Sequence, residues 1–447
     1  MKEGPPEDSM PAEERQGSSL APIPLYEGPV RVRLESGIAE AHSKVTFEWL
    51  PSPHIQVELS SADTSRLHSF GELSVPEEAL LFPEVEDWPT REEPALGPPE
   101  DEVRWTETIK LAHAVEFGRR DGLSSLHLSI INFVNWDLPL YEEVPGQASR
   151  SVLAIDVEGW HIEIRSRYRR RGMSQRIIEM GGYAITHDVE IRRSDESTFA
   201  VQETELLQEC LFLGLSFIKG AHVGLALPVG YDADEKRVWW QWSVTIVDSW
   251  RTPLSWCDPT TISGLGQILS GWMQLAADDF WRVVLMRAAR SLVTANKPDP
   301  LDAAIPIGAI ALEMLSWAIL VKREDWIRPE DKLSEASMTR LMLRWAGIPA
   351  AIPPELVHLP SFISGVAQSD IDIAHGIWQT RNRLVHPPER RSQEWPNRNV
   401  MLDAWRIELE ILELIILRLV GYDGNYTHRR HLQGVLTGDT EPVPWNP

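Results

Sequence analysis

The sequence contains few cysteines, no long uncharged apolar run and no excess of basic residues. Only two of its 447 residues are cysteines, Cys210 and Cys257, which excludes a disulfide framework and a four-cysteine zinc site. No run of about 18 uncharged apolar residues occurs, and the N-terminus lacks the basic-then-apolar pattern of an export signal. We therefore expect a protein of the reducing cytoplasm that is neither exported nor inserted in a membrane.

Positive charge is scarce, and the formal net charge is -23. Because nonspecific affinity for phosphates comes from accumulated Lys and Arg, this balance argues against a general nucleic-acid binder. Residues 1–103 hold 22 acidic against 7 basic residues, so most of the excess lies there and the remainder is mildly acidic. The 43% hydrophobic residues and 19 tryptophans indicate a globular chain with a sizeable core.

The hydrophobic pattern divides the chain into two main parts. Residues 1–22 are rich in Pro, Glu and Ser and are expected to form a disordered tail. From 23 to 260 the dominant period is two, which predicts a β-rich, sandwich-like domain. An acidic, proline-rich loop at about 80–104 and a helical insertion at about 204–220 interrupt this pattern.

From residue 261 to about 435 the hydrophobic period is 3.6, which predicts an all-helical domain before a C-terminal tail at 436–447. Breakers such as NKPDP separate the predicted helices at 262–295, 303–322, 333–346, 370–386 and 399–420. The predicted fold class is therefore α+β, with a β-sandwich-like N-terminal domain followed by a helical bundle.

The segment WQTRNRLVHPP, residues 378–388, ends one of these helices. Asn382 and His386 are four residues apart and share a helix face, whereas Arg381 and His386, five apart, would point about 140° away from each other. Because a following proline disfavours the α conformation, we expect Pro387 to move His386 off the helix axis, from where it can turn toward Arg381. The alternative is an ordinary helix end with a cation-rich last turn that favours the helix dipole.

The stretch RNRLVH, residues 381–386, resembles the R-x(4–6)-H motif of HEPN domains, in which a polar residue, often Asn, follows the arginine. Residues 304–320, AIPIGAIALEMLSWAIL, are similar to the early buried helix of that family. Residues 408–430 look like the closing helix of the ApeA-type anti-phage members, with the ending GY-x-G-x-Y. The resemblance covers about 265–430 and extends to the arrangement of a β-rich domain before a HEPN domain.

This resemblance implies a metal-independent endoribonuclease that needs no cofactor. In such enzymes the ribose 2′-hydroxyl attacks the adjacent phosphate and leaves a cyclic phosphate and a 5′-hydroxyl. Histidine suits the proton transfer because both of its forms are populated near neutrality, and arginine suits phosphate because it is always charged and forked. The implied catalytic residues are Arg381 and His386, with Asn382 binding the phosphate or orienting His386.

The resemblance also implies partners. These are an RNA substrate, with transfer RNA as one target by analogy, and a second copy of the chain bound through the helical domain. A phage-derived trigger is implied as well, with the β-rich domain as sensor or regulator in anti-phage defence. The rival interpretation is a non-enzymatic β-sandwich receptor for a ligand or protein, whose helical domain only dimerises.

Glu313 is the fourth candidate catalytic residue. It is the only charge between Ile305 and Val321, in a segment that is apolar on nearly every face. Because a buried carboxylate without a partner is strongly unfavourable, we expect Glu313 to pair with Arg381 and to orient it. The alternative is that Glu313 faces a solvated gap at a dimer edge.

A basic stretch, RSRYRRRGMSQR, supplies further candidate RNA-binding residues. They are Arg165, Arg167, Tyr168, Arg169, Arg170 and Arg171, followed by Arg176, and the helical domain adds Arg383. The arginines suit an RNA backbone and the tyrosine suits base stacking. The alternative is a solvated hairpin end, or a patch that the acidic loop at 80–104 neutralises.

Two other patterns favour structural roles. In WWQW, residues 239–242, Trp240 and Trp242 alternate onto the face of Val244 and Ile246, which indicates core, and Trp239 points the other way. For Trp239 we favour a core or interdomain position over an exposed platform. A metal site at Asp370, Asp372 and His375 is disfavoured, because the two aspartates diverge by about 200° on a helix.

Overall fold

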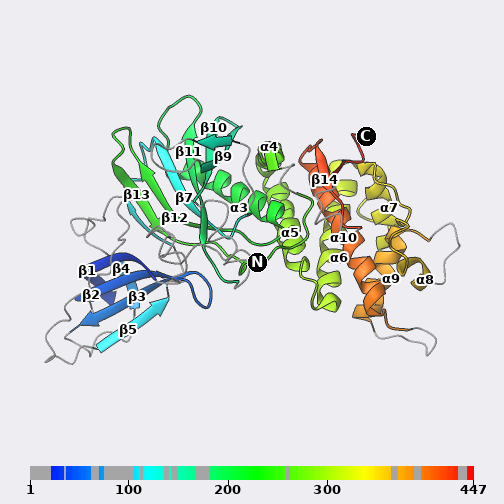
Figure 1. Ribbon diagram of the computed structural model, residues 1–447, viewed down its shortest axis with the longest axis horizontal. Helices are drawn as coiled ribbons and strands as arrows, with labels where there is room; N and C mark the ends of the chain where they lie inside the picture. Colours follow the sequence, from blue (N-terminus) through cyan, green and yellow to red (C-terminus); the bar gives the residue numbers. More distant parts are fainter. Residues whose placement is uncertain are drawn as a thin grey trace, which may run out of the picture. The chain divides into compact units, whose positions relative to one another are not determined.

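A β-rich N-terminal region precedes a helical C-terminal region in the computed structural model (Figure 1). The described residues are 22–34, 37–61, 70–74, 105–110, 114–134, 140–142, 150–167, 181–257, 262–363, 371–386, 394–430 and 440–446. This architecture confirms the predicted α+β class. The predicted N-terminal tail, apart from residue 22, and the acidic loop at 80–104 lie outside the described residues.

The chain forms two compact units, each built from two segments. The first contains residues 1–120 and 226–245, and the second contains residues 121–225 and 246–447. The second unit therefore includes β-strands as well as all the helices of the C-terminal region.

An antiparallel sheet with strand order β4-β1-β2-β3-β5 forms the larger part of the first unit. Its strands are β1 (Ile23–Leu34), β2 (Gly37–Glu48), β3 (His54–Ser61), β4 (Phe70–Ser74) and β5 (Trp105–Lys110). Val45 and Val57 face each other across β2 and β3 and are at most 1% exposed. Alternation along the described parts of β2 and β3 thus buries one face, as the period of two predicts.

Strand β13 of the first unit carries the tryptophan-rich segment. The strands here are β6 (Val115–Gly118), β12 (Gly224–Tyr231) and β13 (Arg237–Trp242). Trp239 pairs with Gly118 and Gly230 on the flanking strands and is 1% exposed, so its core position is confirmed. The expectation that Ile246 shares a core face with Trp242 is wrong, because the strand ends at Trp242 and Ile246 is 63% exposed.

The β-part of the second unit is an antiparallel run in the order β7-β11-β10-β9-β8. Its strands are β7 (Ser125–Ile131), β8 (Leu140–Glu142), β9 (Arg150–Val157), β10 (Trp160–Ser166) and β11 (Ile185–Arg193). Ile162 pairs with Ile191, and Ile164 with Val189, and all four are buried. The residues between them are charged and point to the opposite face of the sheet.

The long helices lie where the period of 3.6 predicts them, whereas the four-residue helix at Leu359–Phe362 was not predicted. The helices are α3 (Glu205–Lys219), α4 (Leu265–Ala276), α5 (Asp279–Ala295), α6 (Leu301–Trp317), α7 (Glu335–Ala346), α8 (Leu359–Phe362), α9 (Ile373–Val385) and α10 (Arg398–Leu419), with the short turns η5 (Val201–Thr204), η6 (Ile262–Gly264) and the π-helix η7 (Ala318–Arg323). The predicted segment 262–295 is split, because the Asp278 side chain accepts hydrogen bonds from the backbone N–H groups of Phe280 and Trp281 and caps a new helix.

Helix α6 is the centre of the helical part (Figure 1). It contacts α5, α7, α9 and α10. Together with η7 it spans Leu301–Arg323, which is long and apolar enough to cross a membrane, and its most apolar 18-residue window has a mean hydropathy of 2.0. Its most apolar window is 61% buried inside the protein, which is consistent with the core helix of a soluble protein.

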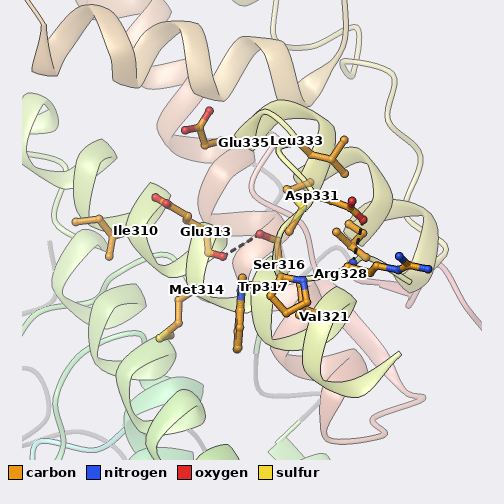
Figure 2. A pocket seen from close by; sticks show the side chains of 13 residues that line it. Ile310, Glu313, Met314, Ser316, Trp317, Val321, Arg328, Asp331, Leu333 and Glu335 are labelled. Carbon is orange, nitrogen blue, oxygen red and sulfur yellow. Dashed lines mark hydrogen bonds between the residues drawn. The ribbon is translucent and has the colours of Figure 1, made fainter. Parts of the chain in front are cut away.

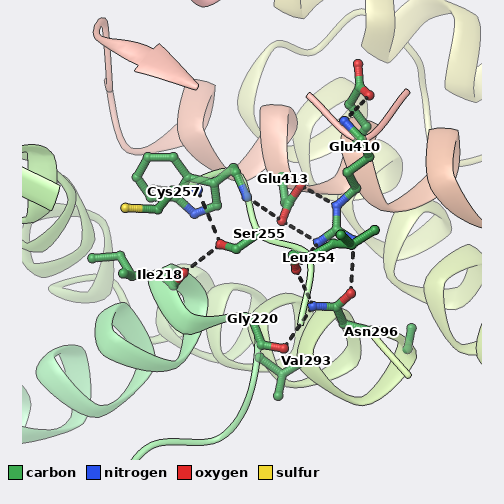
Figure 3. Close-up of polar contacts among 12 residues, drawn as sticks. Ile218, Gly220, Leu254, Ser255, Cys257, Val293, Asn296, Glu410 and Glu413 are labelled. Carbon is green, nitrogen blue, oxygen red and sulfur yellow. Dashed lines mark hydrogen bonds and ion pairs between the residues drawn. The ribbon is translucent and has the colours of Figure 1, made fainter. Parts of the chain in front are cut away.

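A buried polar network holds the second unit together around Arg429 (Figure 3). The Arg429 guanidinium is fully buried and donates to both carboxylate oxygens of Glu413 at 2.6 and 2.7 Å. It also donates to the side-chain oxygen of Asn296 and to the carbonyl of Leu254, at 2.9 and 3.1 Å. Asn296 in turn donates to the carbonyl of Gly220 at 2.9 Å. These bonds join the ends of α3 and α5 to α10.

The described part of the predicted C-terminal tail is ordered. Strand β15 (Thr440–Pro442) pairs with β14 (Asn425–Thr427). The Trp445 indole then donates to the carbonyl of Tyr422 at 2.8 Å. Residues 440–446 therefore pack on the residues that follow α10.

Candidate functional site

Helix α9 positions the Arg-Asn-His motif. The Asp372 side chain caps its N-terminus by accepting a hydrogen bond from the His375 N–H at 2.9 Å. Along its buried face, Ala374 and Trp378 pack with Ala309 of α6, and the Trp378 indole donates to the Thr339 hydroxyl at 2.8 Å. Tight packing on this face fixes the direction in which the helix presents its last turn.

His386 leaves the helix at this last turn. Its φ of -115° and ψ of 127° are extended, and its N–H still donates to the carbonyl of Asn382 at 2.9 Å. This conformation confirms the effect expected of Pro387 on the preceding residue. Both Asn382 and His386 are exposed. That His386 turns toward Arg381 stays a prediction.

Arg381 is half-buried beside them and only partly satisfied. One terminal nitrogen donates to the Asn382 side-chain oxygen at 3.0 Å, and the guanidinium lies 6.0 Å from the centre of the Trp378 ring. Its buried Nε atom has no hydrogen-bond partner within the part of the chain that the structure describes. The arrangement leaves the guanidinium without a carboxylate among those residues, so it can bind an anion such as a phosphate.

The expected buried pair between Glu313 and Arg381 is wrong. Glu313 is exposed, and no ion pair joins the two side chains, both of which the structure describes. The inward face of α6 is formed by residues such as Leu312 and Leu315, which have zero exposure. Because α6 is apolar on nearly every face, its sequence did not reveal that the face carrying Glu313 stays uncovered. Exposure agrees with the alternative of a solvated position.

A different carboxylate, Glu408 of α10, is the buried one. It has zero exposure, and its oxygens have no hydrogen-bond partner among the described residues. Burial raises the pKa of this carboxyl well above its usual range. The carboxyl lies against Gly308 of α6, where an added Cβ would be 2.5 Å from one of its oxygens. The charged pattern ELEILEL in α10 could have signalled that some of its carboxylates are buried.

Arg383, in the last turn of α9, is engaged within the chain. Its guanidinium lies 4.3 Å from the centre of the Phe362 ring, and it donates to the carbonyl of Glu394 at 3.4 Å. These contacts hold its positive charge on the same turn as Asn382 and His386.

The described arginines of the basic stretch are paired with carboxylates. Arg165 donates to Glu190 at 2.7 Å and also pairs with Glu163. Arg167 pairs with Asp188 at 2.6 Å. The partners belong to strands β10 and β11, not to the acidic loop, so this charge is neutralised within the sheet. Tyr168, Arg169, Arg170, Arg171 and Arg176 lie outside the described residues.

Within the described ranges, no group of three or more His, Cys, Asp or Glu side chains could hold a metal ion. Asp372 instead accepts a hydrogen bond from Arg340, which also contacts the His375 ring. Asp370, the third residue of that disfavoured site, lies outside the described residues.

A pocket opens beside Glu313 on the outer side of α6. Its volume is about 590 Å³, and its walls come from α6, η7, the loop after η7 and the start of α7 (Figure 2). Neither Arg381 nor His386 lines this pocket, so the helical part presents two separate candidate sites.

Two family models match the chain. Residues 118–253 match the model of the YopA central domain, and residues 278–440 match that of the YopA C-terminal domain. The chain is also similar to the SPbeta prophage-derived uncharacterized protein YopA of Bacillus subtilis strain 168, with 26% identity over 329 residues, which is 72% of each chain. No solved structure matches it. The second of these models spans α9 and both candidate sites.

Proposed function

We propose that this protein is a metal-independent endoribonuclease whose catalytic residues are Arg381 and His386 at the end of α9. One observation carries the proposal: the last turn of α9 leaves His386 exposed, and Arg381, five residues earlier on the same helix, lacks a carboxylate partner among the described residues. RNA is the proposed substrate, and the cytoplasm is the proposed location.

Each group has a defined role in the proposed reaction. The 2′-oxygen forms a bond to the adjacent phosphorus while the bond from phosphorus to the 5′-oxygen breaks, which gives a 2′,3′-cyclic phosphate and a 5′-hydroxyl. A histidine accepts the 2′-hydroxyl proton, and a second one donates a proton to the departing 5′-oxygen. Arg381 binds the charged phosphate oxygens, and the Asn382 amide, which already contacts Arg381, orients it.

The proposed reaction needs a second copy of the chain. His386 is one histidine at one helix end, and it cannot easily act as base and acid in the same turnover. Two copies related by a twofold axis bring two such ends to one cleft. Glu313 has no role in this scheme, because it is exposed and does not touch Arg381.

The biological role that fits such an activity is anti-phage defence, in which a phage-derived trigger releases cleavage of cellular RNA. The β-rich part is the proposed sensor or regulator. Similarity to a prophage-derived protein supports a role in phage biology.

The catalytic assignment is tested with purified protein, total RNA and EDTA. We expect cleavage that survives chelation and ends in cyclic phosphates. His386→Ala should reduce turnover by about 10²- to 10⁴-fold while RNA binding persists, since it removes only proton transfer. Arg381→Lys should also be severely impaired, because lysine keeps the charge but loses the fork that matches a phosphate.

The matched control is His358→Ala, since His358 is an exposed histidine whose side chain caps no helix. This variant should cleave RNA like the wild type. If His386→Ala is folded and still cuts RNA at the normal rate, the assignment is wrong. If the wild type cuts no RNA even in cells exposed to phage, the non-enzymatic receptor becomes the better interpretation.

A further inference from the structure

The pocket beside α6 has the size and the walls of a ligand site. At about 590 Å³ it lies within the range of about 300–1,000 Å³ that is typical of small-molecule sites. Figure 2 shows Ile310, Glu313, Met314 and Trp317 projecting from α6 on one side. Residues 327–338, from the loop and the start of α7, supply the other lining side chains.

Large apolar side chains are exposed at this pocket. Ile310 is 57%, Trp317 44% and Leu333 45% exposed, and all three line it. Scattered exposed apolar residues are ordinary, but a contiguous group around a hollow marks a binding surface. Trp317 in addition offers an indole ring, the aromatic surface to which cations bind best.

The charges at the pocket are mainly negative. Glu313, Asp331 and Glu335 line it, against one guanidinium, that of Arg328. Asp331 accepts a hydrogen bond from the backbone N–H of Arg328 at 3.1 Å. Glu313 and Glu335 have no ion-pair partner in the described part of the chain. Two carboxylates beside an indole therefore face the pocket without a cation of their own.

The backbone that forms one wall is also irregular. Helix α6 continues into the π-helix η7, in which the N–H of Glu324 donates to the carbonyl of Ile319 five residues earlier, at 2.9 Å. Asp325 follows with a φ of 51°, in the left-handed region that favours glycine. π-turns of this kind are frequent at functional sites. This is an observation independent of the charges.

We propose that this pocket binds a small amphipathic organic cation, with its apolar group against Ile310 and Trp317 and its ammonium or guanidinium group between Glu313 and Glu335. The apolar walls supply most of the affinity, and the two carboxylates select the sign of the charge. An anion of the same size meets two like charges and is rejected. The site is separate from Arg381 and His386, and the proposal does not depend on ribonuclease activity.

The test uses three probes with one apolar group and different charges, at neutral pH and low salt. They are 1-naphthylmethylammonium, neutral 1-naphthylmethanol and anionic 1-naphthoate, each titrated into the full chain by calorimetry and saturation-transfer NMR. We expect the cation to bind more tightly than the alcohol, and the anion not to bind. The preference for the cation should shrink at high salt, because the carboxylates are solvent-exposed.

Substitutions locate the binding. Glu313→Gln with Glu335→Gln should weaken binding of the cation by about two- to thirtyfold and leave the alcohol unchanged, given the usual strength of exposed charge pairs. Trp317→Ala should weaken both the cation and the alcohol. Trp395→Ala is the matched control for the indole, since Trp395 is 56% exposed and lies outside the lining.

A second control distinguishes binding of the cation in the pocket from nonspecific attraction of cations to a chain of net charge -23. Asp121→Asn with Glu235→Gln removes the same two charges from exposed positions outside the lining and should not change binding of the cation. Equal loss in both double variants would refute the proposal. So would equal affinity for the cation and the alcohol, or no saturable binding of any probe at millimolar concentration. Binding of a basic amphipathic peptide, without binding of the naphthyl cation, would assign the pocket to a protein partner instead.

Discussion

Glu408 is a buried residue whose carboxyl group lies in an unfavourable environment in the protein core. Its carboxyl is enclosed between α10 and Gly308 of α6, and it has no hydrogen-bond partner among the described residues. Because burial penalises the charged form, the pKa of the Glu408 carboxyl is raised well above its usual range. The carboxyl lies so close to Gly308 that a Cβ at this position would be 2.5 Å from one of its oxygens, so a larger residue there would displace the Glu408 side chain.

Glu408→Gln should therefore stabilise the protein, and more so as the pH rises. The raised pKa means that folding takes up a proton, so the contribution of Glu408 to stability is fully present below its unfolded-state pKa of about 4.3 and is lost as the pH rises above it. Glutamine keeps the shape and does not titrate. We expect a gain of about 1–3 kcal/mol at pH 8 that shrinks toward pH 4, measured by urea unfolding.

Glu313→Gln is the control for this prediction, because Glu313 is exposed. Its effect on stability should be small and nearly the same at both pH values. A Glu408→Gln protein that is less stable than the wild type at pH 8 would show that the buried carboxyl has a partner that stabilises its charge.

At the scale of elements, the hydrogen bonds around Arg429 join helices α3, α5 and α10. Arg429 and Glu413 form a buried ion pair, and Glu413 also accepts a hydrogen bond from the backbone N–H of Trp256 at 3.2 Å. Burial raises the pKa of the Glu413 carboxyl, and the Arg429 guanidinium opposes this rise. A buried pair of this kind is not a large source of net stability, but losing one partner leaves an uncompensated charge.

Arg429→Met should consequently lower the free energy of unfolding by about 3–5 kcal/mol, because it leaves Glu413 buried without a cation. Adding Glu413→Gln to Arg429→Met should recover part of the loss. The measurement is urea denaturation followed by circular dichroism of the helices. Arg430→Met is the control, since Arg430 is 27% exposed, its partner Glu441 is 40% exposed, and its buried partner Glu410 keeps a hydrogen bond from the Arg429 backbone N–H at 2.9 Å, so its effect should be smaller. Equal losses in the two single variants would contradict this account.

At the scale of the whole molecule, the proposed nuclease depends on assembly. The exposed end of α9 carries one histidine per chain, while the proposed reaction uses two. The net charge of -23 opposes approach of RNA, so binding must rely on local cations such as Arg381 and Arg383.

We predict a homodimer that forms through the helical part. Light scattering at micromolar concentration should give about twice the 50.7 kDa mass of one chain. His386→Ala should leave this mass unchanged, because it alters chemistry and not the fold. A mass of one chain together with full ribonuclease activity would rule out the need for a second copy.

Sequence patterns determined much of this structure because they act over short distances. The change of period near residue 262 and the breakers between helices gave the α+β class and nearly every long helix. Pro387 acts on its immediate neighbour, so the extended backbone of His386 was also predictable. The split at Asp278 is local too, and its capping signal in AADDFW could have been found.

Tertiary structure alone decided which side chains are covered. Helix α6 is apolar on nearly every face, so only the packing of α5, α7, α9 and α10 around it shows that Glu313 is exposed while Glu408 is buried. Trp239 is buried in a strand that pairs with Gly118 and Gly230 on its two neighbours, and the first of these pairings links positions far apart in the sequence. The sequence by itself thus determined the local backbone, and long-range packing decided burial, charge pairing and the place of the pocket.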